Sequence, residues 1–165
     1  MNKTKNIILL TFSLISFFIF AACLFVMFFI ETNYETGYSV INIVCGTSFW
    51  LSLIVGIILQ IVLSTSIKRW HKRRRLCNSR FVRMRMGLLS LFSNIPAAIS
   101  DIALGTSLVV FIVFMFVNQS SIFAYISLSV LCFSFCSHCI FNGRNYYYIT
   151  NYEHIKTQIM KTEEK

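Results

Sequence analysis

Asp101 is the only acidic residue inside the long apolar runs of this 165-residue chain, and it is the first candidate for chemistry. A carboxylate at membrane depth is costly and usually has a partner or a function. Counted from the ends of their own runs, Gln60 and His138 lie at a similar depth near the same membrane face. The sequence therefore predicts an intramembrane polar layer formed by Gln60, Asp101 and His138.

Asp101 and His138 are expected to contact each other directly or through one water. Only four residues, 118–121, separate the runs that carry them, and so short a turn makes the two helices antiparallel neighbours. In one interpretation this contact is structural and holds the helices together by hydrogen bonding. In the other, the pair lies on a proton or ion path.

Two thiols, Cys136 and Cys139, lie at the same depth and flank His138. Cysteine, histidine and aspartate are zinc ligands, so a metal site formed by these three residues and Asp101 is one hypothesis. A single Cys-x-x-Cys pair is a weak signal, and neighbouring side chains on a helix point about 100° apart. We expect no metal and no cofactor.

Four spans with Cys136-Ser137-His138-Cys139 in the last one resemble the vitamin K epoxide reductase family. The resemblance covers only the span count and these four residues. The cysteine pair of that family faces the outer side and receives electrons from an extracytoplasmic cysteine pair. Here the pair is expected near the cytoplasmic face, and residues 31–39 contain no cysteine, so no family is assigned.

The composition predicts an all-α membrane protein. The chain is 56% hydrophobic and only 13% charged, whereas soluble domains are about 25% charged. The runs 7–30, 40–63, 96–117 and 122–141 can each cross a hydrocarbon core of ~30 Å as helices. The first run is interpreted as a span rather than a signal peptide, because apolar residues continue to Ile30. A stripe of small and polar residues in each run predicts a single four-transmembrane-helix bundle over residues 1–165.

Nine of the fifteen Lys and Arg residues lie between positions 68 and 85. Such a cluster between two spans indicates the cytoplasmic side, and the basic residues near both termini agree with it, so both ends are expected inside. We expect the cluster to bind anionic phospholipid headgroups rather than nucleic acid, for which no module is present. The predicted headgroup-binding residues are Lys68, Arg69, Lys72, Arg73, Arg74, Arg75, Arg80, Arg83 and Arg85.

Two amphipathic helices are expected outside the spans. In the cytoplasmic basic segment 64–95, residues 80–94 place Arg80 and Arg83 opposite Phe81 and Met84, which predicts a helix lying in the membrane interface. Asn94 is the expected N-cap of the third span, with a proline in its first turn. In the cytoplasmic tail 142–165, a short helix is expected to begin at a capping box over 150–153.

These features predict a small, non-catalytic protein of the inner or plasma membrane, acting as a lipid-interacting accessory or regulatory subunit. Its expected partners are anionic phospholipids and either another membrane protein or further copies of itself. The alternative is a small oligomeric transporter or channel with the Asp101/His138 layer on its path. An enzyme is not expected, because the chain lacks a phosphate loop, a Ser/His/Asp order and paired carboxylates.

Overall fold

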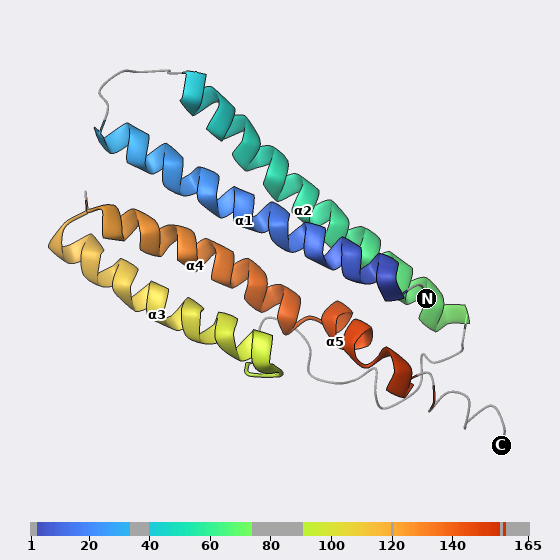
Figure 1. The fold of residues 1–165 in the computed structure, drawn as a ribbon. Helices are drawn as coiled ribbons and strands as arrows, with labels where there is room; N and C mark the ends of the chain where they lie inside the picture. The colour runs from blue at the N-terminus through green and yellow to red at the C-terminus, as the bar shows by residue number, and fades with distance from the viewer. Residues whose placement is uncertain (1–2, 34–39, 74–90, 120, 156, 158–165) are drawn as a thin grey trace.

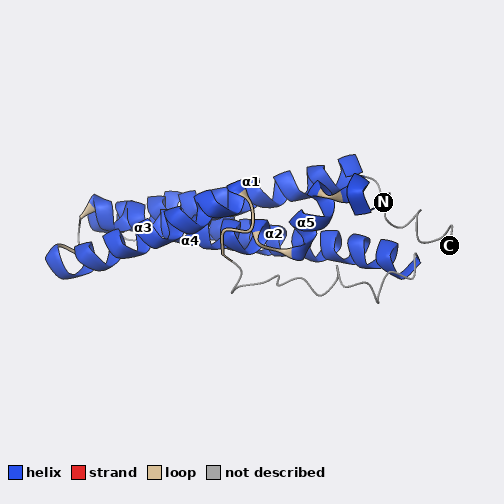
Figure 2. Cartoon of the chain, turned by 90° about the horizontal axis from the view of Figure 1, so that it is seen from below, coloured by secondary structure: helices blue, strands red, loops and turns tan. Residues whose placement is uncertain are grey.

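The protein is all-α in the computed structural model, which describes residues 3–33, 40–73, 91–119, 121–155 and 157. Four long helices are present: α1 (Lys3–Asn33), α2 (Val40–Arg73), α3 (Ile95–Val117) and α4 (Ile122–Phe141). The short helix α5 (Arg144–Thr150) follows, and the described residues form helices and loops without a strand (Figures 1 and 2). All four long helices are long and apolar enough to cross a membrane. By helix length and hydropathy the chain is therefore a multi-pass, four-span membrane protein, as predicted.

The four spans pack as two antiparallel hairpins rather than as four equivalent neighbours. Helix α1 packs against α2, and α3 packs against α4. The two hairpins meet through α1 and α4, so that α2 and α3 lie on the outside (Figure 1). The start of α1, the end of α2 and helix α5 lie toward one end of the molecule (Figure 1). We call it the basic end, after Lys5, Lys68, Arg69 and Arg144.

The described helices expose apolar side chains and bury small polar ones. Phe18, Ile99 and Phe116 are more than half exposed, whereas the hydroxyl side chains of Ser13 and Ser127 are buried. Lipid provides no hydrophobic drive for helix association, so close contact of small residues and interhelical hydrogen bonds must hold such helices together. The arrangement has the polarity expected of a protein surrounded by lipid.

Helix α2 extends beyond the predicted end of the second span at Leu63 and continues to Arg73. Residues 64–73 contain neither glycine nor proline, so nothing in the backbone ends the helix there. Leu63 and Ile67 are fully buried in a core that also contains Tyr148 and Ile149 of α5. The helix therefore continues into the basic segment 64–95, because tertiary packing extends past the apolar run.

The predicted amphipathic helix over 80–94 does not reach Asn94. Residues 91–94 are not helical, and 80–90 lie outside the described residues. The Asn94 side chain instead accepts a hydrogen bond from the Ala97 amide, with Pro96 in the first turn of α3. This N-cap confirms the predicted start of the third span.

A helix that was not predicted precedes the capping box over 150–153. Helix α5 starts at Arg144, and a further helical turn covers 152–155. The break at Asn142 and Gly143 lets the chain turn so that Tyr148 and Ile149 become buried. Gly143 has a φ of −78°, which any residue can adopt, so glycine is not needed there for its backbone conformation. It is needed for space, because an added Cβ would lie 2.7 Å from the carbonyl oxygen of Cys139.

Candidate functional site

Asp101 and His138 are in direct contact, as the sequence predicted. The Nδ1 atom of His138 lies 2.5 Å from Oδ1 of Asp101, and both side chains are buried at the interface of α3 and α4. A carboxylate can only accept hydrogen bonds, so Nδ1 of the imidazole carries the proton in this contact. The contact holds the start of α3 against the end of α4.

Asn142 completes this pair into a buried triad. Its Nδ2 atom donates to Oδ1 of Asp101 at 3.1 Å and lies 3.1 Å from Nδ1 of His138. Asn142 is also the C-cap residue of α4, and Asn-Gly is a typical helix-ending pair. Its position four residues after His138, on the same helix face, was the signal that could have placed it in the site.

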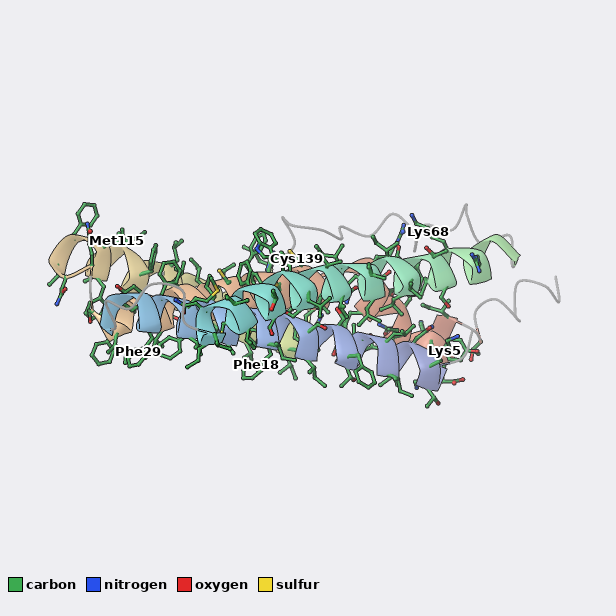
Figure 3. All side chains as sticks on the ribbon, turned by 90° about the horizontal axis from the view of Figure 1, so that it is seen from above. Lys5, Phe18, Phe29, Lys68, Met115 and Cys139 are labelled. Atoms are coloured by element: carbon green, nitrogen blue, oxygen red, sulfur yellow. The ribbon has the colours of Figure 1, made fainter. Side chains whose placement is uncertain are left out.

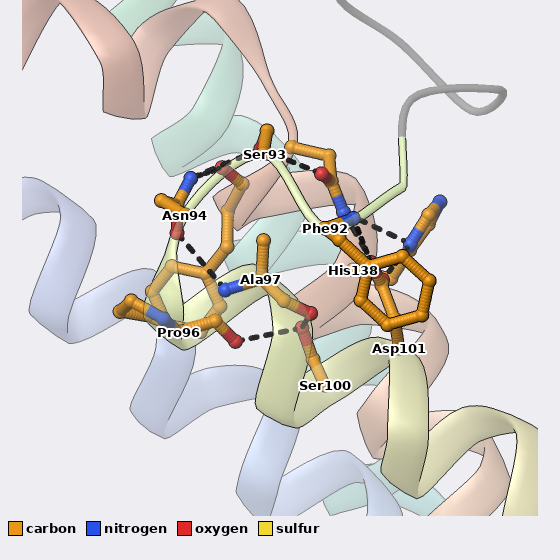
Figure 4. A network of polar contacts seen from close by, with 10 residues as sticks. Phe92, Ser93, Asn94, Pro96, Ala97, Ser100, Asp101 and His138 are labelled. Atoms are coloured by element: carbon orange, nitrogen blue, oxygen red, sulfur yellow. Dashed lines mark hydrogen bonds and ion pairs between the residues drawn. The ribbon is translucent and has the colours of Figure 1, made fainter.

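The segment preceding α3 supplies the remaining hydrogen bonds (Figure 4). The backbone N–H of Phe92 donates to Oδ2 of Asp101 at 2.7 Å, and Phe92 itself has a left-handed φ of 53°. The Ser93 hydroxyl donates to Oδ1 of Asn142 at 2.7 Å, and the Asn94 amide donates to the Phe141 carbonyl at 2.9 Å. No sequence pattern predicted the Phe92 contact, because it depends on a backbone conformation unusual for a non-glycine residue.

Each oxygen of the Asp101 carboxylate thus accepts hydrogen bonds from the protein. Oδ1 is bonded by His138 and Asn142, and Oδ2 by the Phe92 amide. A buried carboxylate loses its hydration, and these donors replace the lost water contacts. The geometry is that of a satisfied polar cluster joining two helix ends and a loop.

Gln60 does not bond to this cluster, so the structure brings together only two of the three residues of the predicted layer. Its Nε2 atom donates to the Ser13 hydroxyl at 3.0 Å, and its Oε1 atom accepts from Asn145 at 3.4 Å. The Ser13 hydroxyl in turn donates to the Gly56 carbonyl at 3.3 Å. The rotation of α2 directs the Gln60 side chain toward α1 and α5.

The thiols do not join the Asp101 cluster either. Among the described residues, no three His, Cys, Asp or Glu side chains come together in a way that could hold a metal ion. The hypothesis of a site formed by Cys136, Cys139, His138 and Asp101 is therefore contradicted. His138 is directed toward α3, and Cys136 and Cys139 instead line a groove shared with α2.

That groove has a volume of about 440 Å³ and is almost entirely apolar. Leu53, Ile57 and Ile61 of α2 line one side, and Phe135 and Cys139 of α4 line the other. Phe17 of α1 also lines it, and neither Asp101 nor His138 does. The buried carboxylate is therefore separate from this cavity.

The predicted headgroup-binding residues are only partly within the described structure. Lys68 and Arg69 are exposed at the end of α2, and Lys72 and Arg73 belong to the same helix. Arg74, Arg75, Arg80, Arg83 and Arg85 lie outside the described residues. Lys68 lies toward the basic end, as does Lys5 (Figure 3).

Comparisons of the chain with protein-family models, with curated proteins and with solved structures found no match.

Proposed function

We propose that this four-span protein is a non-catalytic membrane component that binds anionic phospholipid at the cytoplasmic face and acts beside a partner protein or further copies of itself. The observation that carries the proposal is the gathering of cationic side chains at one end of four membrane-length helices. Positive charge at a span's end favours the cytoplasmic side, where each Lys or Arg near an anionic surface contributes about 1 kcal/mol.

The Asp101 cluster supports a structural rather than a catalytic use of its residues. Its carboxylate is buried and hydrogen-bonded by His138, Asn142 and the Phe92 amide, and it does not line the apolar groove. An active site presents such groups to a pocket that a substrate can enter. Here they join α3, α4 and the loop before α3.

The test compares lipid binding by the detergent-purified full chain and by a variant in which Lys72, Arg73, Arg74 and Arg75 are replaced by Gln. Phosphatidylglycerol and phosphatidylcholine are titrated, and bound lipid is counted by native mass spectrometry. We expect the wild type to prefer phosphatidylglycerol and the variant to lose at least about tenfold in affinity, since about 1.4 kcal/mol corresponds to tenfold.

The control replaces Lys156, Lys161 and Lys165 by Gln, which lowers the charge elsewhere and should leave the preference in place. Added salt should also weaken binding by the wild type. Equal binding of the two lipids by the wild type would contradict the proposal.

A proton-coupled transporter is the second candidate, favoured by the 2.5 Å carboxylate–imidazole contact within the predicted spans. Ionisable pairs at such depth form proton relays in pumps and transporters. Proteoliposomes containing a pH-sensitive dye distinguish the two functions. Proton flux that Asp101→Asn abolishes would favour transport, and wild-type vesicles no leakier than empty ones would exclude this candidate.

A further inference from the structure

The groove between α2 and α4 exists because α1 packs on both helices and separates them. Phe17 of α1 contributes to its lining, and the side chains of α2 and α4 form its two sides. Its one long polar side chain, Gln60, directs its amide toward Ser13 and Asn145. The groove consequently presents an apolar surface that is open to the surrounding lipid.

The dimensions of the groove match one acyl chain. Along α2 it extends from Leu53 to Ser64, which is about 17 Å at 1.5 Å per residue. One leaflet occupies half of a ~30 Å hydrocarbon core, so the groove is about one leaflet deep. Its volume of about 440 Å³ lies within the 300–1,000 Å³ that is usual for ligand pockets.

A cationic side chain lies just beyond the groove, toward the basic end of the molecule. Ile57, Ile61 and Ser64 form a stripe on one face of α2, and Lys68 lies one turn further along the same stripe. Lys68 is exposed, and it lies on the same side of the molecule as Cys139 of the opposite wall (Figure 3). Arg69, its neighbour, is turned about 100° away from this stripe.

We infer that the groove binds one acyl chain of an anionic phospholipid of the leaflet at the basic end, whose headgroup phosphate pairs with Lys68. This inference rests on the proposed function and deepens it, because it assigns one defined lipid site to a surface that otherwise attracts anionic lipid in general. An apolar slot that leads to a cation favours a lipid with a net negative charge, because in a zwitterionic lipid the ammonium beside the phosphate offsets part of the attraction.

The experiment uses two pairs of variants of the full chain. Ile57→Trp fills the groove, and Ile58→Trp is its control: Ile57 and Ile58 are 46% and 51% exposed, and only Ile57 lines the groove. Lys68→Gln removes the cation on the stripe, and Arg69→Gln removes the neighbouring cation. Each protein is titrated with phosphatidylglycerol in detergent, and the bound lipid and the oligomeric state are read by native mass spectrometry.

We expect Ile57→Trp and Lys68→Gln to weaken the tightest-bound phosphatidylglycerol at least fivefold, and Ile58→Trp and Arg69→Gln to leave it within twofold of the wild type. Equal binding by both tryptophan variants would overturn the groove assignment and leave the proposed function standing if phosphatidylglycerol is still preferred. Equal binding of phosphatidylglycerol and phosphatidylcholine by the wild type would overturn both. If Ile57→Trp changes the number of subunits but not lipid binding, a second copy occupies the groove and the inference is wrong.

Discussion

Oδ1 of Asp101 and Nδ1 of His138 lie 2.5 Å apart, although the two residues are 37 positions apart in the chain. Asn142 bonds to the same carboxylate oxygen, and the Phe92 amide bonds to the other. The loop before α3 and the end of α4 are thus held by a single side chain. Stability measurements on this cluster test whether it is structural.

Replacing Asp101 by Leu removes an acceptor that serves three donors, and it should lower the free energy of unfolding by about 2 kcal/mol at about 0.6 kcal/mol per membrane hydrogen bond. Asp101→Asn should cost less than half as much, because its amide oxygen still accepts from the Phe92 amide and its nitrogen can donate to a neutral His138. Unfolding of the detergent-purified wild type and variants measures both losses of stability. Equal losses for Asn and Leu would contradict a hydrogen-bonded structural role.

The left-handed backbone at Phe92 predicts opposite effects for two substitutions. An L-residue in this conformation costs about 1–2 kcal/mol, and glycine avoids that cost. Phe92 is 60% exposed, so little packing is lost on its removal. Phe92→Gly should leave the melting temperature unchanged or raise it, whereas Phe92→Val should lower it, because a β-branched residue is poorly tolerated at this φ. If the melting temperature of Phe92→Gly were lower than that of Phe92→Val, the left-handed conformation would not form.

Two glycines form a matched pair for a steric test. A Cβ at Gly143 would lie 2.7 Å and 2.9 Å from the carbonyl oxygens of Cys139 and Ile140, which belong to the backbone and cannot move aside. A Cβ at Gly105 would meet nothing within 4 Å. Gly143→Ala should therefore destabilise the protein by about 1–3 kcal/mol, and Gly105→Ala should stabilise it by up to about 1 kcal/mol through helix propensity. Thermal unfolding of the two variants and the wild type under the same conditions measures both changes in stability.

The membrane orientation is tested with reporter fusions. Basic residues near both termini and between the second and third spans predict that all three segments face the cytoplasm. A reporter after Lys165 should be active as a cytoplasmic fusion, and one inserted within 34–38 should report the outer side. A C-terminal reporter active only outside would show that the C-terminus is not cytoplasmic and would contradict the predicted four-span topology.

The sequence alone was sufficient for the four spans and for the contact between Asp101 and His138. An apolar run of membrane length forms a helix in lipid, because a helix bonds all of its backbone polar groups within the same segment. The four-residue turn at 118–121 then made α3 and α4 antiparallel neighbours, which brought the two ionisable side chains to the same depth. Local rules also placed the N-cap at Asn94.

Tertiary structure decided which polar groups meet and how far the helices continue. Depth along the membrane can be counted from sequence, but the rotation of each helix about its axis depends on the packing of all its neighbours. Gln60 therefore bonds to Ser13 and not to the Asp101 cluster, and Cys139 lines a groove and not a metal site. The extension of α2 past Leu63 depends on burial of Ile67 in the core that contains Tyr148, a contact between segments far apart in the chain. Such contacts leave no local pattern, because each side chain is selected only for its fit to a surface that the folded chain creates.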